Sequence, residues 1–212
     1  MRRPIIIFSA LLAFSALQVP LFAGSVQKLK NEQVSVTEDS LAAGQAETLP
    51  AEHPSMIVYL STGTVAISSA HDKPGRAQVK RGETTFEPIG TKSLKNDGGS
   101  ELRFVRVEFL TSGRDETWGR TGMPPNYSIL IENRYARAYD IKIAPHSFEQ
   151  RHTHHDRVVV CLSGATLEHL LPNGEKQPST LKTGEIVWRP GATHVGHNMG
   201  STELWVIAIE PK

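Results

Sequence analysis

Cysteine and an excess of charge of one sign, two features that often determine a protein's class, are nearly absent from this sequence. Cys161 is the only cysteine in 212 residues, so no disulfide can form within the chain. It lies in the apolar run VVVCLSG, a position typical of a core residue and not of a nucleophile. The 23 basic and 22 acidic residues give a formal net charge of +1. This balance gives no indication of nucleic-acid binding.

Long apolar runs are missing as well, except at the N-terminus. A basic start, MRRP, precedes the 13-residue stretch Ile5–Leu17, and LFAGS then supplies small residues for cleavage near Ala23. This order is typical of a secretory signal peptide, and the stretch is short of the roughly 20 residues that span a bilayer. We predict a signal peptide at residues 1–23, a periplasmic or secreted protein, and no stable membrane span after cleavage. An uncleaved anchor is the alternative.

Helical periodicity is lacking in the rest of the chain. Short β-branched or aromatic runs occur instead, many of them alternating: MIVYL, LRFVRVEFL, YSILI, AYDIKIA, VVVCL, EIVWRP and ELWVIAI. Clusters rich in Gly, Pro, Asn and Ser separate them, such as STGT, LPNGE and NMGS. This pattern predicts an all-β protein with few or no helices after the signal peptide, built as a sandwich or small barrel.

The chain contains an internal repeat. Gly82–Glu108 aligns without a gap on Gly184–Glu210, 102 residues later, and nine of 27 positions are identical. Chance would give about two. Upstream, one residue of slippage to an offset of 101 places His53 on His154, Val58 on Val159 and Gly63 on Gly164. We predict two copies of one module at residues 26–110 and 127–212, joined by a connection at 111–126 that is rich in Gly, Pro and charge.

The second copy carries a motif that resembles one of the cupin superfamily. In cupins a glycine is followed by Pro-x-Gly, a histidine and an asparagine, and here Gly184, Pro190, His194 and Asn198 occupy those positions. Ala192 replaces the second glycine of the motif, and the spacing before His194 is one residue shorter than usual.

The other cupin motif is His-x-His, then a glutamate, then a glycine. His152 and His154 form His-x-His and Gly164 is the closing glycine, but Arg157 stands at the glutamate position. The resemblance covers nearly the whole chain after residue 23. It implies a bicupin, which is two double-stranded β-helix (jelly-roll) barrels in tandem, acting as a monomer or homodimer.

The first copy has the same pattern without the ligands. Ala51 and His53 align with His152 and His154, Met56 aligns with Arg157, and Lys92 aligns with His194. We therefore expect no metal in the first copy, which would serve packing, dimerisation or ligand enclosure.

The histidines of the second copy suggest a metal site. His152 and His154 are two residues apart, so a strand would place both imidazoles on one face. The resemblance places His194 on a neighbouring strand that faces the same cavity. Three neutral imidazoles can bind Fe, Mn, Zn, Ni or Cu and leave positions open for a small-molecule ligand. The alternative is a set of polar histidines at a barrel mouth.

Arg157 allows two interpretations. Facing inward, it would repel a divalent cation and could clamp a carboxylate or phosphate. Facing outward, it is a surface charge, because a shift of one residue reverses the face of a strand. Candidates for a fourth ligand or a ligand-orienting residue are Gln150, His155 and His197.

Two functions follow from the sequence. The first is an exported, metal-dependent small-molecule enzyme of dioxygenase, isomerase, decarboxylase or lyase type, which uses the second barrel. The alternative is a non-catalytic bicupin that binds a small molecule or anion and keeps a residual histidine site. The sequence selects neither a reaction nor a metal.

Overall fold

The computed structural model describes residues 24–49, 52–69, 74–120 and 122–212, so the predicted signal peptide lies outside the described residues. Strands and loops make up these ranges, and none of them contains a helix, so no helix there could cross a membrane. The predicted all-β class is confirmed. The nine strands of the first half are β1 (Gly24–Lys30), β2 (Val34–Leu41), β3 (Ala46–Leu49), β4 (Ser55–Tyr59), β5 (Gly63–Ser69), β6 (Gly75–Val79), β7 (Thr84–Glu87), β8 (Lys92–Asn96) and β9 (Leu102–Phe109).

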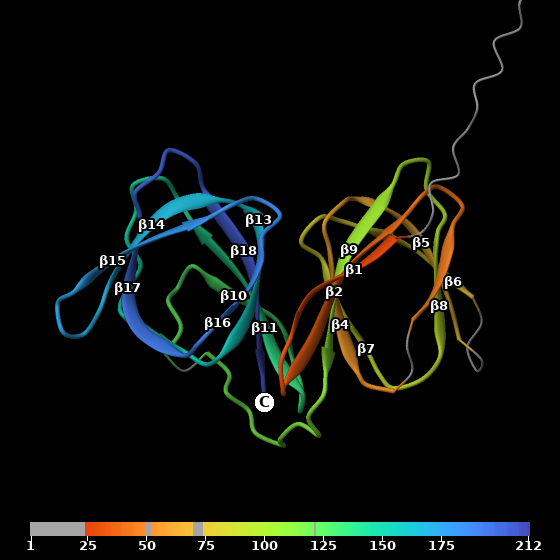
Figure 1. Cartoon of the computed structure of the whole chain (residues 1–212), viewed down its shortest axis with the longest axis horizontal. Helices are drawn as coiled ribbons and strands as arrows, with labels where there is room; N and C mark the ends of the chain where they lie inside the picture. The colour runs from red at the N-terminus through yellow and green to blue at the C-terminus, as the bar shows by residue number, and fades with distance from the viewer. Residues whose placement is uncertain (1–23, 50–51, 70–73, 121) are drawn as a thin grey trace, which may run out of the picture.

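The second half repeats this series. Its strands are β10 (Tyr127–Glu132), β11 (Ala136–Ile143), β12 (His152–His154), β13 (Arg157–Ser163), β14 (Ala165–Leu170), β15 (Lys176–Leu181), β16 (Ile186–Arg189), β17 (Ala192–Asn198) and β18 (Leu204–Pro211). Each half forms one five-stranded and one four-stranded antiparallel sheet. The sheets β1-β2-β9-β4-β7 and β3-β8-β5-β6 enclose the N-terminal barrel, and β10-β11-β18-β13-β16 and β12-β17-β14-β15 enclose the C-terminal barrel (Figure 1).

Strand pairing shows how the two copies correspond. Val58 pairs with Val105 in the N-terminal barrel, and Val160 pairs with Ile207 in the C-terminal barrel. Val58 corresponds to Val160 and Val105 to Ile207, each 102 residues later, which is the offset of the gapless alignment downstream. The predicted slippage to an offset of 101 is therefore wrong for this strand: Ser55, and not Met56, occupies the place of Arg157, since it pairs with Glu87 as Arg157 pairs with Arg189.

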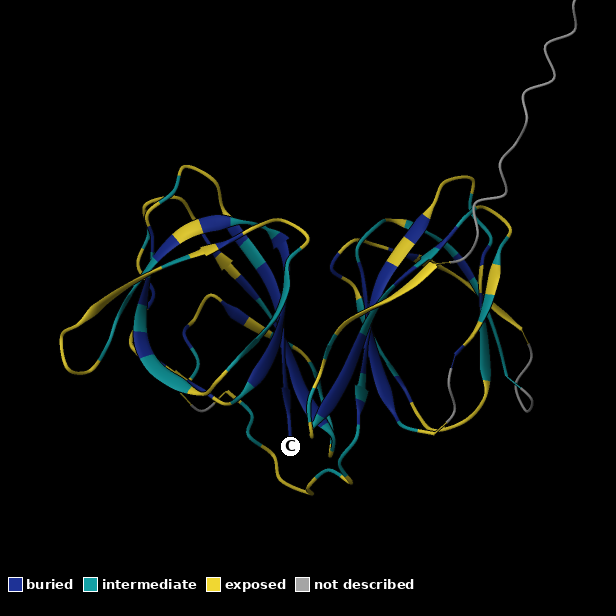
Figure 2. Ribbon diagram, in the orientation of Figure 1, coloured by how far each residue is buried: buried dark blue, intermediate teal, exposed yellow. Residues whose placement is uncertain are grey.

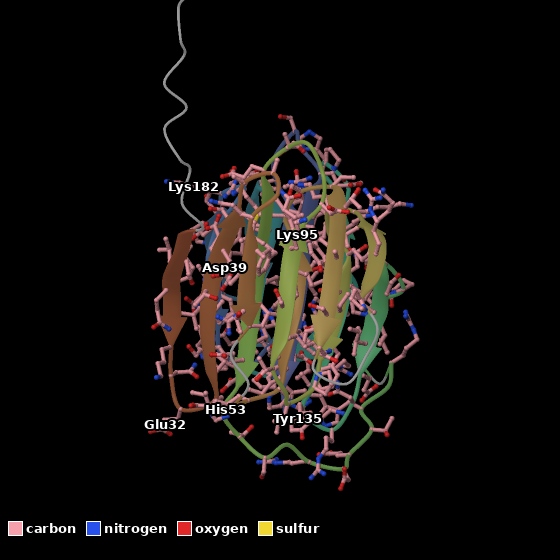
Figure 3. The ribbon with its side chains drawn as sticks, turned by 90° about the vertical axis from the view of Figure 1, so that its right-hand side faces the viewer. Glu32, Asp39, His53, Lys95, Tyr135 and Lys182 are labelled. Carbon is pink, nitrogen blue, oxygen red and sulfur yellow. The ribbon has the colours of Figure 1, made fainter. Side chains whose placement is uncertain are left out.

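His53 does not take the place of His154. It lies outside the strands, near Tyr135 and the end of the molecule where the connection runs (Figure 3). Ala51, which the alignment placed on His152, lies outside the described residues. Instead, Leu49 pairs with Lys92 in the N-terminal barrel as His152 pairs with His194 in the C-terminal barrel.

A repeated turn explains two of the identical residues. Gly82 and Gly184 both have φ of +84°, a conformation that glycine adopts without the steric cost of a Cβ atom. The glutamate that follows each glycine accepts a hydrogen bond from a turn amide, Lys80 N to Glu83 Oε2 at 3.0 Å and Lys182 N to Glu185 Oε2 at 2.8 Å. The Gly-Glu pair is thus retained because both copies need this turn.

Asn198 fastens the turn that follows the His194 strand. Its Nδ2 donates to the carbonyl oxygens of Ile143 and Thr202, and its Oδ1 accepts from Gly200 N. Asn96 makes the same three bonds in the N-terminal barrel. This asparagine is therefore a structural residue and does not contact the metal-ligand candidates.

The two barrels pack against each other through their five-stranded sheets. One face of each sheet contributes to a single shared apolar cluster, in which Val36, Val58 and Val107 of one barrel meet Ala138, Val160 and Ile209 of the other. The facing strands are the most buried parts of the molecule (Figure 2). Strand β1 lies beside β16 and β7 lies beside β10, so the interface has approximate two-fold symmetry.

The opposite face of each five-stranded sheet points into its own barrel. Cys161 lies there, fully buried among apolar residues of the C-terminal barrel, as expected of a core residue. Burial raises the pKa of its thiol to about 11, which removes the thiolate that a nucleophile would need.

Candidate metal centre

Three histidines meet inside the C-terminal barrel. His152 and His154 come from β12 and His194 from the paired strand β17, directly opposite His152. All three side chains are buried, and one ring nitrogen from each lies within 4.8 Å of the others. The Nε2 atoms of His152 and His154 are 2.9 Å apart. Two nitrogens at about 2.0–2.1 Å from one metal ion lie roughly 3–4 Å apart, so the group needs only small adjustments to bind an ion.

Hydrogen bonds on the outer ring nitrogens fix the tautomers. His152 Nδ1 lies 2.7 Å from the carbonyl oxygen of Gln150, which can only accept, so Nδ1 carries the proton. His154 Nδ1 lies 2.8 Å from the Tyr139 hydroxyl, which donates its own proton to Glu210 Oε1 at 2.7 Å and therefore accepts from the histidine. Both Nε2 atoms then direct lone pairs toward each other. The Tyr127 hydroxyl lies beside both atoms and can donate its one proton to only one of them. A lone pair on Nε2 with the proton held on Nδ1 is the arrangement that metal-binding imidazoles adopt.

Two of the three rings, those of His154 and His194, are neutral at physiological pH. Burial lowers the pKa of His154 to about 4, although Glu210 acts in the opposite direction. Burial, together with the neighbouring histidines, lowers the pKa of His194 to about 2. Neutral imidazole is the form that binds a metal.

A buried chain of charges supports His154 from behind. Arg137 donates from Nε and Nη2 to Glu210 Oε2 at 3.0 and 2.6 Å, while Glu210 Oε1 accepts from Tyr139. Burial would raise the pKa of Glu210, but the nearby His154, the bond from Tyr139 and the charge of Arg137 hold it at about 2. Glu210 is therefore an anion that fixes the position of Tyr139 and, through it, of His154.

Glu149 is a buried carboxylate that the motif comparison did not identify. Its Oε2 lies 3.9 Å from His152 Nε2, and it lines the same cavity. Space for it exists because residue 196 is glycine: a Cβ there would lie 2.2 Å from Glu149 Oε2. Burial raises the pKa of Glu149. The carboxylate was sought after His154 in the sequence, whereas the chain supplies one three residues before His152.

Two further groups beside the histidines were also missed. The Tyr127 hydroxyl lies 3.1 Å from His152 Nε2 and 3.4 Å from His154 Nε2. The His169 ring contacts that of His194 edge-on with centroids 4.5 Å apart, and its buried Nδ1 has no hydrogen-bond partner among the described residues. Strand alternation could have identified His169, because it is two residues after the inward-facing Leu167.

The three candidates for a fourth ligand lie outside this group. Gln150 is exposed and contributes only its carbonyl oxygen. His155 is exposed and stacks on Trp118, with ring centroids 4.0 Å apart. His197 stacks on the exposed Phe148 at 3.7 Å. His155 lies in the loop between β12 and β13, and His197 faces outward on β17 because it is an odd number of residues from the inward-facing His194.

Arg157 faces inward. It is 8% exposed and lines a cavity of about 200 Å³ together with His154, His194 and Glu149. Burial lowers the pKa of its guanidinium, which still stays protonated at neutral pH. The surface interpretation is therefore excluded by the geometry, and a positive charge lies beside the histidines.

Comparison with known proteins gives a consistent picture of the fold. No family model and no curated protein matches the sequence. Among solved structures, a cupin 2 conserved barrel domain protein from Leptotrichia buccalis is 13% identical, with 91% of this chain and 90% of that chain covered and a TM-score of 0.60. AerE from Microcystis aeruginosa is 12% identical, with coverage of 90% and 97% and a TM-score of 0.63.

An oxalate decarboxylase variant from Bacillus subtilis is 12% identical, with 89% of this chain and 72% of that chain covered and a TM-score of 0.65. Identities this low establish shared architecture and not shared chemistry. The paired barrels, the repeated strand register and these structural matches agree: the chain has the cupin fold in its two-barrel form.

Proposed function

We propose that the C-terminal barrel binds one divalent transition metal ion through His152, His154 and His194 and acts as a metal-dependent small-molecule enzyme. The observation that carries this proposal is the convergence of three buried ring nitrogens within 4.8 Å of one another, with the Nε2 atoms of His152 and His154 2.9 Å apart and the Nδ1 atom of each of these two rings held by a hydrogen-bond partner. When bound, such an ion acts as a Lewis acid on an oxygen of the substrate or binds O₂.

The protein's own groups have separate roles in this proposal. Tyr139 and Glu210 keep the His154 ring in place, while apolar side chains such as Val159 and Leu167 exclude water from the cavity. Glu149, a carboxyl group whose pKa is raised by burial, is placed to hold or accept a proton beside His152. These roles suit the reaction types found among cupins (dioxygenase, isomerase, decarboxylase and lyase) and do not select one of them.

Metal analysis after reconstitution with Fe, Mn, Zn, Ni and Cu in turn tests the proposal. We expect about one equivalent of one of these metals per chain in the wild type and almost none in a His152→Ala, His194→Ala double variant. Lys92→Ala, at the position of His194 in the other barrel, and His155→Ala, beside the site, are matched controls that should retain the metal. Less than about 0.2 equivalents in the wild type for every metal would contradict the proposal.

A non-catalytic binding protein is the second candidate, and Arg157 favours it. A guanidinium that lines the cavity opposes the binding of a dication and attracts an anion. The same metal analysis separates the two candidates, because only the enzyme requires a bound ion.

We also propose that the chain is exported. The support is the basic, apolar and small-residue order of residues 1–23, which precedes the first strand at Gly24. Expression with a reporter fused after Lys212 and mass spectrometry of the mature N-terminus test this. A mature chain that begins near Gly24 in the periplasm or medium is expected, and a cytoplasmic chain that begins at Met1 would contradict it.

A further inference from the structure

Two arginines line the cavity of the C-terminal barrel from neighbouring strands. Arg157 on β13 and Arg189 on β16 are direct partners in the antiparallel ladder. Arg157 Nη1 donates to the carbonyl oxygens of His155 and Pro190, each at 3.3 Å, and Arg189 Nη2 donates to Ser179 Oγ at 3.4 Å. Across the part of the chain that the structure describes, no carboxylate lies within ion-pair distance of either guanidinium. Most of their ten N–H donors thus remain available.

The same ladder position in the N-terminal barrel is balanced in charge. Ser55 and Glu87 stand where Arg157 and Arg189 stand. The Glu87 carboxylate binds Lys92 Nζ at 2.6 Å, with both side chains largely buried. One copy therefore neutralises its interior with a direct ion pair, whereas in the other neither guanidinium has a carboxylate in direct contact, although Glu149 lines the same cavity. A buried guanidinium without a directly bonded anion favours the binding of an anion that enters the cavity.

The cavity has a polar mouth and an apolar interior. Gln177 and Ser179 on β15 and Arg189 on β16 line one part of it, and Gln177 is exposed. Strands β15 and β16 are the edge strands of the two sheets, so the cavity opens at the seam between the sheets. Its walls are mainly apolar, and its inner part reaches His154 and His194.

We propose that this cavity binds a small monocarboxylate with an apolar body, and that Arg157 and Arg189 together bind the carboxylate. Planar guanidinium groups suit a carboxylate because two parallel N–H···O bonds can form. The volume of about 200 Å³ limits the body to a few carbon atoms, since it lies below the roughly 300–1,000 Å³ of drug-sized sites. The inference extends the proposed function, because it names the class of molecule that would meet the metal, but the anion subsite itself does not require a metal.

Binding measurements on the metal-free full chain test the proposal. Isothermal titration or ligand-detected NMR compares acetate, isobutyrate and benzoate with the matching neutral amides, and with inorganic phosphate. We expect at least one of the two larger carboxylates to bind about tenfold or more tightly than its amide, because charged hydrogen bonds replace neutral ones. Arg157→Gln and Arg189→Gln should each lower that affinity about tenfold. Arg151→Gln, which changes an exposed arginine just before β12, should leave it unchanged.

The outcomes separate this proposal from the metal proposal. If no carboxylate exceeds its amide in affinity, or if phosphate binds more tightly than every carboxylate, the monocarboxylate assignment is overturned whatever the metal content. The comparison with amides uses the wild type, so it holds even if an arginine variant fails to fold. If the carboxylates bind as expected but reconstitution yields no metal, the anion subsite stands and the metal-dependent function fails.

Discussion

The two barrels of this chain share a backbone plan and differ in what they enclose. Strand pairs correspond at a constant 102 residues in the five-stranded sheets, as Val58–Val105 and Val160–Ile207 show. Residues that build turns are retained, as the matched hydrogen bonds of Asn96 and Asn198 show. The backbone is therefore maintained by a few turn and ladder residues, which leaves the interior side chains free to differ.

The interiors differ at matched positions. The N-terminal barrel has Lys92 where the C-terminal barrel has His194, and its Phe104 pairs with Tyr59 where the smaller Val206 pairs with Cys161. Large rings and an internal ion pair fill one barrel, while small side chains and histidines leave a cavity in the other. The difference supports the proposal that the C-terminal barrel carries the function and that the N-terminal barrel serves as its packing partner.

The largest difference in stability between the barrels should come from replacing their matched glutamates, Glu108 and Glu210, by alanine. Glu210 is fully buried, so Glu210→Ala leaves Arg137 as an uncompensated buried charge and should lower the free energy of unfolding by about 3–5 kcal/mol. Glu108→Ala should lower it by only about 1–2 kcal/mol, because Glu108 is partly exposed and Arg106 keeps Asp39 at 3.7 Å. Denaturant unfolding of the metal-free variants measures both values. Equal losses would show that the two charge pairs are equivalent.

The next largest difference in stability should come from exchanging the matched interior residues Phe104 and Val206. Phe104→Val creates a void in a filled barrel and should lower the free energy of unfolding by about 2–3 kcal/mol. Val206→Phe should cost at most about 1 kcal/mol, since the added ring enters existing space. The second variant should also lower the affinity for the tightest-binding carboxylate by more than about tenfold. A Val206→Phe variant as unstable as Phe104→Val would contradict the assigned cavity.

The fit of Glu149 against Gly196 can be tested by a double-mutant cycle. Gly196→Ala brings a methyl group against the carboxylate and should cost about 1–3 kcal/mol of stability. Adding Glu149→Ala should recover part of that loss, because the clash is removed. Gly75→Ala on β6 of the other barrel meets no atom within 4 Å and serves as the control. Additive losses in the cycle would show that Glu149 lies elsewhere.

Acid should affect the stability of the two barrels in opposite directions. Burial lowers the pKa of His169 from its ordinary value of 6.5 to about 4, so between these two pH values the unfolded chain binds more protons and stability falls as pH falls. Burial and the nearby Asp39 raise the pKa of Glu47 from its ordinary value of 4.5 to about 7, so stability falls as pH rises between these two values.

Amide hydrogen exchange of the metal-free protein at about pH 5 and about pH 7.5, corrected for intrinsic rates, resolves the barrels separately. The C-terminal barrel should lose protection at the lower pH and the N-terminal barrel at the higher one. Glu47→Gln should remove the response of the N-terminal barrel. A parallel response of both barrels would refute the assigned protonation states.

The sequence predicted the fold well, because alternating short strands and a repeat both depend on local residue order. His152, His154 and His194 were found because a spacing of two residues and a known motif place them on one face. The upstream alignment failed because it matched Gly63 with Gly164 on residue type alone. In the ladders Val65 pairs with Asn96 as Leu167 pairs with Asn198, so the strands correspond at an offset of 102 and not 101. Side-chain identity is a weaker guide to register than backbone pairing.

Groups that surround the histidines could not be predicted in the same way. Tyr127, Tyr139 and Arg137 come from the first two strands of the module, and only the folded barrel brings them to β12. Glu149 precedes the histidines, and its inward position depends on the missing side chain at Gly196. Contacts of this kind are set by packing between distant segments, which periodicity and motif spacing do not encode.

Anomalous diffraction from crystals of the reconstituted protein, recorded at the absorption edge of the metal, tests the central claim most directly. The account predicts one strong peak per chain, within about 2.0–2.3 Å of ring nitrogens of His152, His154 and His194, and none inside the N-terminal barrel around Lys92. A peak at Lys92, a peak bound only by surface residues, or no peak in metal-saturated crystals would contradict it.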